Sequence, residues 1–518
     1  MVDVGSCKNK TLPNSNYVEI FDTTLRDGSQ TPNVNLTLTD KLDLTEKLDG
    51  MVDFIEGGWP YSNPRDKKYF EKVNLRKSKL IAFGMTAKNE VSKDENLKAL
   101  IKSKADIACI VAKSWDLHVT DVLNIELEKN LEKIENSIKF LKKNGMKVFV
   151  DLEHYFDAFK ENSVYLKKVL SSCKLADKII LCDTNGGAMP KVVERAVNFA
   201  KKHSNVSLGV HMHNDSGLAL ANTLTALDLG LDHIQGTVNG LGERCGNLDL
   251  CQIMPLLEFR KNKDLMADME KIKDLSYFVE RLTNFKLSKN HPFTGENAFK
   301  HKAGLHVDAV KKNNSTYEHM DLSKIGQKRT FDLSEQAGRA NIVLIAKRHG
   351  FNLDKNDKIT KKLLKEVKQR QYINEADLFL LLSKEIDGIN DPFELKGYNI
   401  HIKDEGKDNA EIKLCSKGKC VKKTKEGIGP VHAFDKALRS SLSGFFDIEK
   451  VTLANYKVRI LNEEKGTDAA VEVLIEFKSN GDKWYTSAVS RDVIKASEKA
   501  LINGYKYYLV KKIRGDFN

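Results

Sequence analysis

The first half of the chain alternates short apolar runs with amphipathic stretches, and this alternation limits the possible folds. From Val18 to about Arg260 the apolar runs read VEIFDTTL, FIEGG, LIAFGMT, IACIVAKS, KVFVDLEHYF, KIILCDTNGG, SLGVHMHND and HIQGTVNGLG. Between them lie segments such as 126–143, 190–202 and 218–229, where apolar residues recur every three or four positions, as in amphipathic helices. About eight strand–helix units of this size predict a (β/α)8 TIM barrel, which is an α/β fold.

Polar and charged residues gather where the predicted strands end. They are Arg26, Asp27, Glu56, Lys113, Glu153, Asp183, Thr184, His211, His213 and residues 239–247. A TIM barrel builds its active site at the carboxyl ends of its strands, so we expect these side chains to lie around one site. A doubly wound sheet is the alternative fold, although no glycine-rich phosphate-binding sequence follows the first strand.

His211 and His213 belong to one predicted strand, in which residues two positions apart point to the same side. Both imidazoles can therefore reach one cation, and Asp27 supplies an anionic oxygen from the end of another strand. Two histidines and one carboxylate leave coordination positions open for a substrate, as in catalytic metal sites. Taken alone, such a histidine pair is more often structural, because histidine frequently packs inside domains.

The second half of the chain has two further kinds of sequence. Residues 261–385 are rich in Lys, Asp, Leu and Glu and have a helix-forming composition, and residues 286–391 are predicted to be helical linker subdomains. From residue 392 onward, a pattern of three short strands and one helix occurs twice, which predicts a separate α+β domain built from a βββα repeat. The predicted organisation is a flexible N-terminus over 1–16, a catalytic barrel over 17–285, linker subdomains over 286–391 and a C-terminal regulatory or dimerisation domain over 392–518.

Composition narrows the class of protein. Hydrophobic residues make up 41% of the chain and charged residues 30%, which is typical of a globular protein. The net charge is +12, but the basic residues are spread along the whole chain and interleaved with acidic residues, so we expect no nucleic-acid partner. A local basic patch could serve a phosphate-bearing cofactor. We expect no membrane partner and a cytoplasmic location, because no apolar run is long enough to span a bilayer and the start lacks a signal peptide. The eight cysteines are scattered without a Cys-x-x-Cys pair and predict free thiols.

Three segments of the chain resemble the signature segments of the DRE-TIM metallolyases. They are FDTTLRDGSQ, HMHND and NGLGERCGN, and they occur in the order found in that family. Within the superfamily, the chain is similar to the acyl-CoA Claisen-condensing group of 2-isopropylmalate, homocitrate and citramalate synthases. The segment IEGGWPYSNPRD most resembles one citramalate synthase subfamily, and the βββα repeat with its GIGPVHA turn resembles the effector-binding domain of the same group.

The resemblance implies a divalent-metal site and a binding site for a 2-oxoacid. Asp27, His211 and His213 match the metal ligands of the family, with Asn247 as a fourth, weaker oxygen donor. These donors suit Mn, Mg, Zn and Co alike. Arg26 would face the developing oxyanion, and Thr184 would hydrogen-bond the carboxylate of the 2-oxoacid. A salt bridge at the barrel rim for Arg26, a helix cap for Asp27 and a tight turn at Thr184 are the structural alternatives.

The resemblance also implies groups that move protons. Glu153 matches an acidic residue near the acetyl group, with a role in the proton relay. His306 matches the general base or acid outside the barrel, and Tyr317 approximates a tyrosine that assists it. In this family the other subunit of a dimer can contribute that pair. An ordinary residue on a helix surface is the alternative for His306.

The resemblance, carried over to these residues, implies an acyltransferase that condenses acetyl-CoA with pyruvate and hydrolyses the thioester, giving (R)-citramalate and CoA on a route to isoleucine. 2-Isopropylmalate or homocitrate synthase activity remains an alternative, because these enzymes differ only in the side chain of the 2-oxoacid. A retro-aldol lyase would usually lack the terminal repeat, and the complete set of candidate residues argues against a catalytically inactive amino-acid sensor. The duplicated domain further implies a homodimer inhibited by isoleucine, with leucine as the alternative effector.

Overall fold

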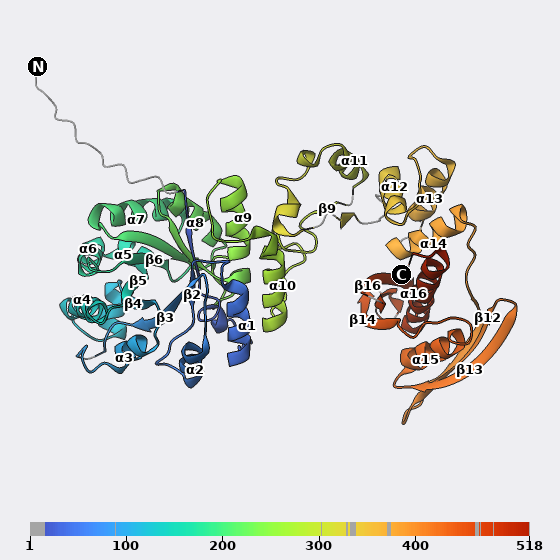
Figure 1. Ribbon diagram of the computed structural model, residues 1–518, viewed down its shortest axis with the longest axis horizontal. Coiled ribbons are helices and arrows are strands. Elements are labelled where there is room, and N and C mark those ends of the chain that lie inside the picture. Colours follow the sequence, from blue (N-terminus) through green and yellow to red (C-terminus); the bar gives the residue numbers. More distant parts are fainter. Residues whose placement is uncertain are drawn as a thin grey trace, which may run out of the picture. The chain divides into compact units, whose positions relative to one another are not determined.

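The computed structural model describes residues 16–516 except 89, 302, 328–329, 332–337, 370–373, 462–465, 467 and 480. The predicted flexible segment 1–16 therefore lies outside the described residues, apart from Asn16. The chain divides into two compact units, Met1–Phe299 with Met320–Lys328 and Lys300–His319 with Arg329–Asn518 (Figure 1). Each unit is described by itself, and the domain boundaries expected from the sequence stay a prediction.

Eight parallel strands close into a barrel in the order β1 to β8, which confirms the predicted TIM barrel and excludes the doubly wound sheet. The strands are β1 Glu19–Asp22, β2 Phe54–Glu56, β3 Lys79–Met85, β4 Ile107–Lys113, β5 Lys147–Glu153, β6 Lys178–Asp183, β7 Ser207–Met212 and β8 His233–Gly236. The barrel closes where residues 19–22 of β1 pair with residues 233–236 of β8. The runs are nearly all apolar because strands of a parallel barrel are covered on both faces.

Helices surround the barrel, and all but the last two lie between successive strands of the sequence (Figure 1, blue to green). They are α1 Leu38–Leu48, α2 Pro64–Lys72, α3 Glu95–Lys102, α4 Leu127–Lys143, α5 Tyr155–Glu161, α6 Ser163–Ser172, α7 Pro190–His203, α8 Ala219–Asp228, α9 Leu250–Arg260 and α10 Ile272–Thr283. Side chains cap α1, α2, α3, α6 and α9: for example, Thr37 and Asp40 form a capping box on α1, and Asn63 caps α2 ahead of Pro64. At these five helices, the cap helps to fix the residue at which the helix begins.

The barrel interior is packed rather than open. Phe21, Phe54 and Phe149 lie at its centre with ring centroids 5.5–6.4 Å apart, and Cys109 and Cys182 belong to the same buried cluster. Aromatic side chains fill such a space efficiently because each buries a large apolar area. The interior is therefore filled with side chains, and the open cavity lies at the carboxyl ends of the strands.

A buried ion pair fixes the loop after β2. The Lys41 ammonium donates to Asp66 Oδ1 at 2.6 Å and to the Gly57 carbonyl at 2.8 Å, and Lys41 is only 2% exposed. Asp66 in turn accepts a hydrogen bond from the Trp59 backbone N–H at 3.0 Å. The Trp59 indole N–H donates to Asn96 Oδ1 at 2.8 Å, so both the backbone and the ring of this tryptophan are held in place.

The second unit contains the predicted α+β repeat, which is confirmed. Its helical part comprises α11 Gly304–Lys312, α12 Arg339–Arg348, α13 Lys358–Gln369 and α14 Glu375–Ile386, with short strands β9 Lys300–His301 and β10 Thr330–Phe331. One βββα unit is β11 Glu394–His401, β12 Asp408–Ser416, β13 Lys419–Gly427 and α15 Pro430–Leu442; the other is β14 Thr452–Ile460, β15 Val471–Ser479, β16 Asp482–Ser490 and α16 Val493–Arg514. Each forms a separate three-stranded antiparallel sheet. Among the described helices of the whole chain, none combines the length and apolar composition needed to cross a bilayer.

The prediction of free thiols is wrong for one pair of cysteines. Cys415 and Cys420 form a disulfide between β12 and β13. The two residues are directly paired in the hairpin register, with Cα atoms 4.0 Å apart. Lys417 and Gly418, both at positive φ, form the tight turn that brings them together. Cys109, Cys173, Cys182, Cys245 and Cys251 are free.

Candidate functional site

A cavity of about 490 Å³ opens at the carboxyl ends of the barrel strands. Six of the predicted site residues line it: Arg26, Asp27, Glu153, Thr184, His211 and His213. They come from the ends of β1, β5, β6 and β7, as a TIM barrel requires. The structure therefore brings together side chains that are far apart in the sequence.

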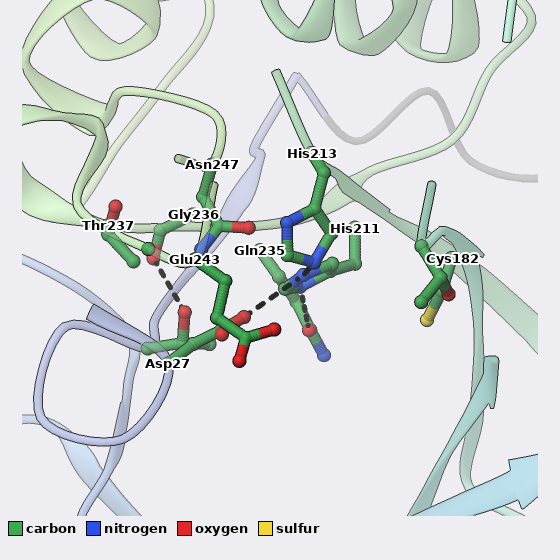
Figure 2. A network of polar contacts seen from close by, with 12 residues as sticks. Asp27, Cys182, His211, His213, Gln235, Gly236, Thr237, Glu243 and Asn247 are labelled. Atoms are coloured by element: carbon green, nitrogen blue, oxygen red, sulfur yellow. Dashed lines mark hydrogen bonds and ion pairs between the residues drawn. The ribbon is translucent and has the colours of Figure 1, made fainter. Parts of the chain in front are cut away.

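Asp27, His211 and His213 place three potential ligand atoms side by side (Figure 2). His211 Nε2 lies 3.3 Å from Asp27 Oδ2 and 3.3 Å from His213 Nε2. All three residues are buried, and Asn247 joins them because it forms a backbone bridge with His213. Within the described part of the chain, the buried Asn247 Oδ1 has no hydrogen-bond partner, so it is available as a further donor.

Hydrogen bonding leaves the Nε2 atom of His211 without a proton in the neutral ring. His211 Nδ1 lies 2.9 Å from Gln235 Oε1, and Gln235 Nε2 donates to Asp151 Oδ1 at 3.1 Å, which fixes the orientation of the amide. Nδ1 of His211 therefore carries the hydrogen, and Nε2 keeps a lone pair. Against the effect of burial, the neighbouring Asp27 carboxylate raises the pKa of His211. Burial, and then the charge that His211 carries when protonated, lower the pKa of His213 to about 3, so the His213 ring is neutral. The Asp27 carboxylate and the two imidazoles thus bring three potential ligand atoms within 4.8 Å of one another, a donor set that fits a divalent cation.

Arg26 lies between the Asp27 cluster and the cavity wall. Its Nε donates to Glu56 Oε2 at 2.7 Å, and its Nη1 lies 3.6 Å from Asp27 Oδ1. Its guanidinium carbon lies 4.0 Å from the centroid of the Phe83 ring. Burial raises the pKa of Glu56 to about 7, although the charge of Arg26 opposes that shift. The salt bridge considered as an alternative for Arg26 thus exists, but it lies inside the barrel mouth and holds the guanidinium at the cavity.

Among the described residues, no acceptor takes the hydroxyl hydrogen of Thr184, which is therefore available to a ligand. The His154 backbone N–H donates to Thr184 Oγ1 at 2.8 Å, so that oxygen accepts on one side and can donate its own hydrogen on the other. His154 adopts a left-handed conformation with φ 60° at the start of α5, and its ring is buried beside Asp157. Glu153, one residue earlier, lines the cavity and forms an ion pair with Lys113.

The loop over residues 239–247 is held by Arg244. Its Nε and Nη2 donate to the two carboxylate oxygens of Asp215 at 2.8 and 3.0 Å, and Nη2 also donates to the Thr184 carbonyl at 2.8 Å. The neighbouring Glu243 is more distant, at 3.7 Å from Arg244 Nη1. Arg244, and with it this loop, is therefore held mainly by Asp215 rather than by its sequence neighbour Glu243.

His306 and Tyr317 belong to the second compact unit. Their rings are stacked, with centroids 4.0 Å apart and planes inclined by 26°. Both side chains are exposed, Tyr317 to 48%. The structure thus brings this predicted pair together within its own unit.

Sequence analysis assigned no role to three buried residues of the site. Gln235 orients His211, Glu56 holds Arg26, and Asp151 holds Gln235. Gln235 and Glu56 are fully buried and Asp151 is 4% exposed, yet each lies in an apolar strand. A polar residue within an apolar strand could have identified each of them as a site residue, because buried polar groups need partners.

Comparison with protein families and known proteins gives consistent results. The HMGL-like family model matches residues 17–279, the homocitrate synthase post-HMGL domain-like model matches residues 293–374, and the LeuA allosteric (dimerisation) domain model matches residues 372–509. An HMG-CoA lyase structure from Bacillus subtilis aligns with a TM-score of 0.47 at 21% identity, covering 54% of this chain and 98% of that chain.

Two relatives named (R)-citramalate synthase match nearly the whole chain. The protein from Aquifex aeolicus is 40% identical and that from Geobacter sulfurreducens 38% identical, each over 95% of this chain and 98% of the relative. A 2-isopropylmalate synthase from Methanocaldococcus jannaschii is 30% identical over 98% of this chain and 97% of that protein. The chain therefore belongs to the HMGL-like family and, within it, to the (R)-citramalate synthases, as the resemblance in its sequence predicted.

Proposed function

We propose that this chain condenses the acetyl group of acetyl-CoA with pyruvate and hydrolyses the thioester, releasing (R)-citramalate and CoA. The observation that carries the proposal is the convergence of Asp27, His211 and His213 beside an open cavity, in a chain similar to named citramalate synthases along nearly its whole length. The activity is that of an acyltransferase that converts acyl groups into alkyl groups on transfer (EC 2.3.3 type). The cytoplasmic location expected from the sequence stays a prediction.

The proposed activity includes a divalent metal ion held by Asp27, His211 and His213, with Asn247 Oδ1 as a further ligand. When bound, the metal would act as a Lewis acid that polarises the keto group of the 2-oxoacid. Two observations support this proposal: the lone pair on Nε2 of His211, and the buried amide oxygen of Asn247 that lacks a partner among the described residues. These donors suit Mn, Mg, Zn and Co.

The chain supplies binding and proton transfer around that site. Arg26, held by Glu56, would stabilise negative charge that develops on oxygen, because its orientation is set before the reaction begins. Thr184 would donate its free hydroxyl hydrogen to the carboxylate of pyruvate. Glu153, which lines the cavity, would take part in the proton relay. His306, stacked on Tyr317, would be the general base, contributed by the same or the partner subunit.

The charges at the cavity favour pyruvate over a dicarboxylic 2-oxoacid. Among the described residues, each cation beside the candidate metal site has a carboxylate partner: Arg26 with Glu56, Lys113 with Glu153, and Arg244 with Asp215. A second carboxylate, as in 2-oxoglutarate, would therefore meet cations that are already neutralised. Phe83 packs edge-on against Trp59 with centroids 5.8 Å apart, which gives a firm apolar wall suited to a methyl group.

With pyruvate, kcat/KM should exceed that with 2-oxoisovalerate by at least about tenfold, because a small apolar pocket excludes extra methyl groups. Release of free thiol from acetyl-CoA, measured against pyruvate, 2-oxoisovalerate and 2-oxoglutarate, checks this. A blank without 2-oxoacid corrects for reaction of the exposed Cys245 with the thiol reagent. Preference for 2-oxoisovalerate would assign the enzyme to 2-isopropylmalate synthesis instead.

Replacing Gln235 with Leu should lower the affinity for Mn²⁺ by about 10–100-fold, because His211 loses the acceptor that orients it. EDTA should abolish activity, and Mn²⁺ should restore it. Titration of the metal-free protein, with free Mn²⁺ followed by electron paramagnetic resonance, measures the affinity. Gln369→Leu, at an exposed position of α13, is the matched control. Full activity of His211→Ala or Asp27→Asn in metal-free buffer would contradict the assignment of the site.

His306→Ala should lower kcat by about 10²–10⁴-fold and leave KM for pyruvate nearly unchanged, because a general base acts mainly in the transition state. Steady-state kinetics at saturating acetyl-CoA measure both constants. His203→Ala, at the end of α7, is the control and should behave like the parent. A rise in KM alone would make His306 a binding residue and leave Glu153 as the candidate base.

We further propose that the second unit forms a homodimer and that isoleucine inhibits the enzyme through it. The match to the LeuA allosteric (dimerisation) domain supports this, and so does the edge strand β14. Along that strand Leu453, Val458 and Ile460 are 38%, 47% and 52% exposed, an apolar surface that a second copy would cover.

Isoleucine should shift the rate or the apparent affinity for pyruvate by about 5–150-fold, the usual range of allosteric coupling. Titrations with isoleucine and leucine, with valine as the comparison, identify the effector, and sedimentation gives the size of the assembly. If no titration changes the kinetics at millimolar concentration while the protein sediments as a dimer, the domain serves dimerisation without control.

A further inference from the structure

The cavity extends beyond the candidate metal site to a group of basic residues. Lys88 lies in the loop after β3, Lys133 on α4 and Arg65 on α2, and all three line the cavity. His211 comes from β7, which stands across the closed barrel from β3. The three cations therefore belong to the side of the barrel mouth opposite the histidines, where the lining passes from the strand ends to the outer helices.

Lys88 and Lys133 differ from other lysines nearby. Lys98 pairs with Glu95 on α3, Lys129 with Glu132 on α4, and Lys139 with Glu135 on α4. In the described part of the chain, the ammonium groups of Lys88 and Lys133 have no carboxylate within the 4.0 Å of an ion pair. The Nε atom of Arg65 is buried without a hydrogen-bond partner there. This limb of the cavity thus carries positive charge that the protein does not neutralise by direct pairing.

Hydrogen bonds fix the backbone on which these cations stand. The Ala87 N–H donates to Ser137 Oγ at 2.9 Å, and Ser137 Oγ donates to the Lys133 carbonyl at 2.6 Å. The loop that carries Lys88 is therefore joined to the turn of α4 that carries Lys133. On the other wall, Arg65 Nη1 donates to the Leu36 carbonyl at 2.5 Å, which holds the guanidinium in place.

A continuous stretch of chain lines the path from the metal side to the cations. Residues 83–88 all line the cavity, beginning at Phe83, which lies under Arg26, and ending at Lys88. This stretch spans at most about 16 Å when extended. Its side chains are mostly apolar or small, with Trp59 beside Phe83. A ligand with a reactive group at one end, an apolar arm and phosphates at the other would match this order.

We propose that Lys88, Lys133 and Arg65 bind the phosphate groups of the acyl-CoA substrate, while its pantetheine arm follows residues 83–88 to the reaction centre. The inference rests on the proposed function, because it takes acetyl-CoA as the thioester. Ammonium groups attract phosphate as point charges, and a guanidinium adds directed hydrogen bonds. Free inorganic phosphate shares this chemistry and would compete for the same groups.

The test compares acetyl-CoA with acetyl-pantetheine, which keeps the arm and thioester but lacks the phosphates. In the double variant Lys88→Gln/Lys133→Gln, KM for acetyl-CoA should rise by roughly tenfold, with kcat and KM for pyruvate unchanged. With acetyl-pantetheine the double variant and the parent should have the same KM. Inorganic phosphate should compete with acetyl-CoA in the parent and lose that effect in the double variant. Lys129→Gln, on the same helix but paired with Glu132, is the matched control and should match the parent.

Two results would overturn the inference while leaving the proposed function intact. One is an unchanged KM for acetyl-CoA in a double variant that still releases thiol with pyruvate. The other is an equal rise in KM for acetyl-pantetheine, which would show a general distortion of the cavity. The affinity for CoA, measured by calorimetry on the parent and on the double variant, tests the phosphate site separately from the proposed function. If no 2-oxoacid supports thiol release but CoA binds the parent and binds the variant more weakly, the proposed function fails and the phosphate site stands.

Discussion

Closure of the parallel barrel between β1 and β8 is the constraint on which the whole site depends. It places all eight carboxyl ends around one opening, so Asp27 after β1 meets His211 at the end of β7. Gln235 on β8 then bridges His211 and Asp151 on β5, across the interior. Buried polar groups such as these need partners, and Asn247 Oδ1, which has none among the described residues, points to a ligand.

Periodicity in the sequence was sufficient to predict the barrel, the βββα repeat and the side-by-side placement of His211 and His213, because these follow from local geometry. It could not identify partners that depend on packing. Gln235 meets His211 only in the folded barrel, so its sequence neighbours do not mark it as a site residue. Arg244 stands next to Glu243 in the sequence but donates its hydrogen bonds to Asp215. The Cys415–Cys420 disulfide depends on hairpin register, which cysteine spacing alone does not reveal.

Charge is distributed in two different ways around the cavity. Beside the candidate metal site, cations and carboxylates form ion pairs whose charges largely cancel. A second anionic group on a ligand would therefore be attracted only weakly there. On the side of β3 and α4, Lys88 and Lys133 form no such ion pair with any residue that the structure describes. The net charge of +12 gave no sign of this division, because overall composition does not record which charges are neutralised by neighbours.

The left-handed backbone at His154 limits how this barrel can be redesigned. Its N–H reaches Thr184 Oγ1 only because the chain reverses at that point, so the identity of residue 154 sets the direction of a hydroxyl on a different strand. Glycine and asparagine tolerate this conformation, whereas β-branched residues do not. An engineer who reshapes the pocket for a larger 2-oxoacid would therefore have few choices at a position whose side chain faces away from the ligand.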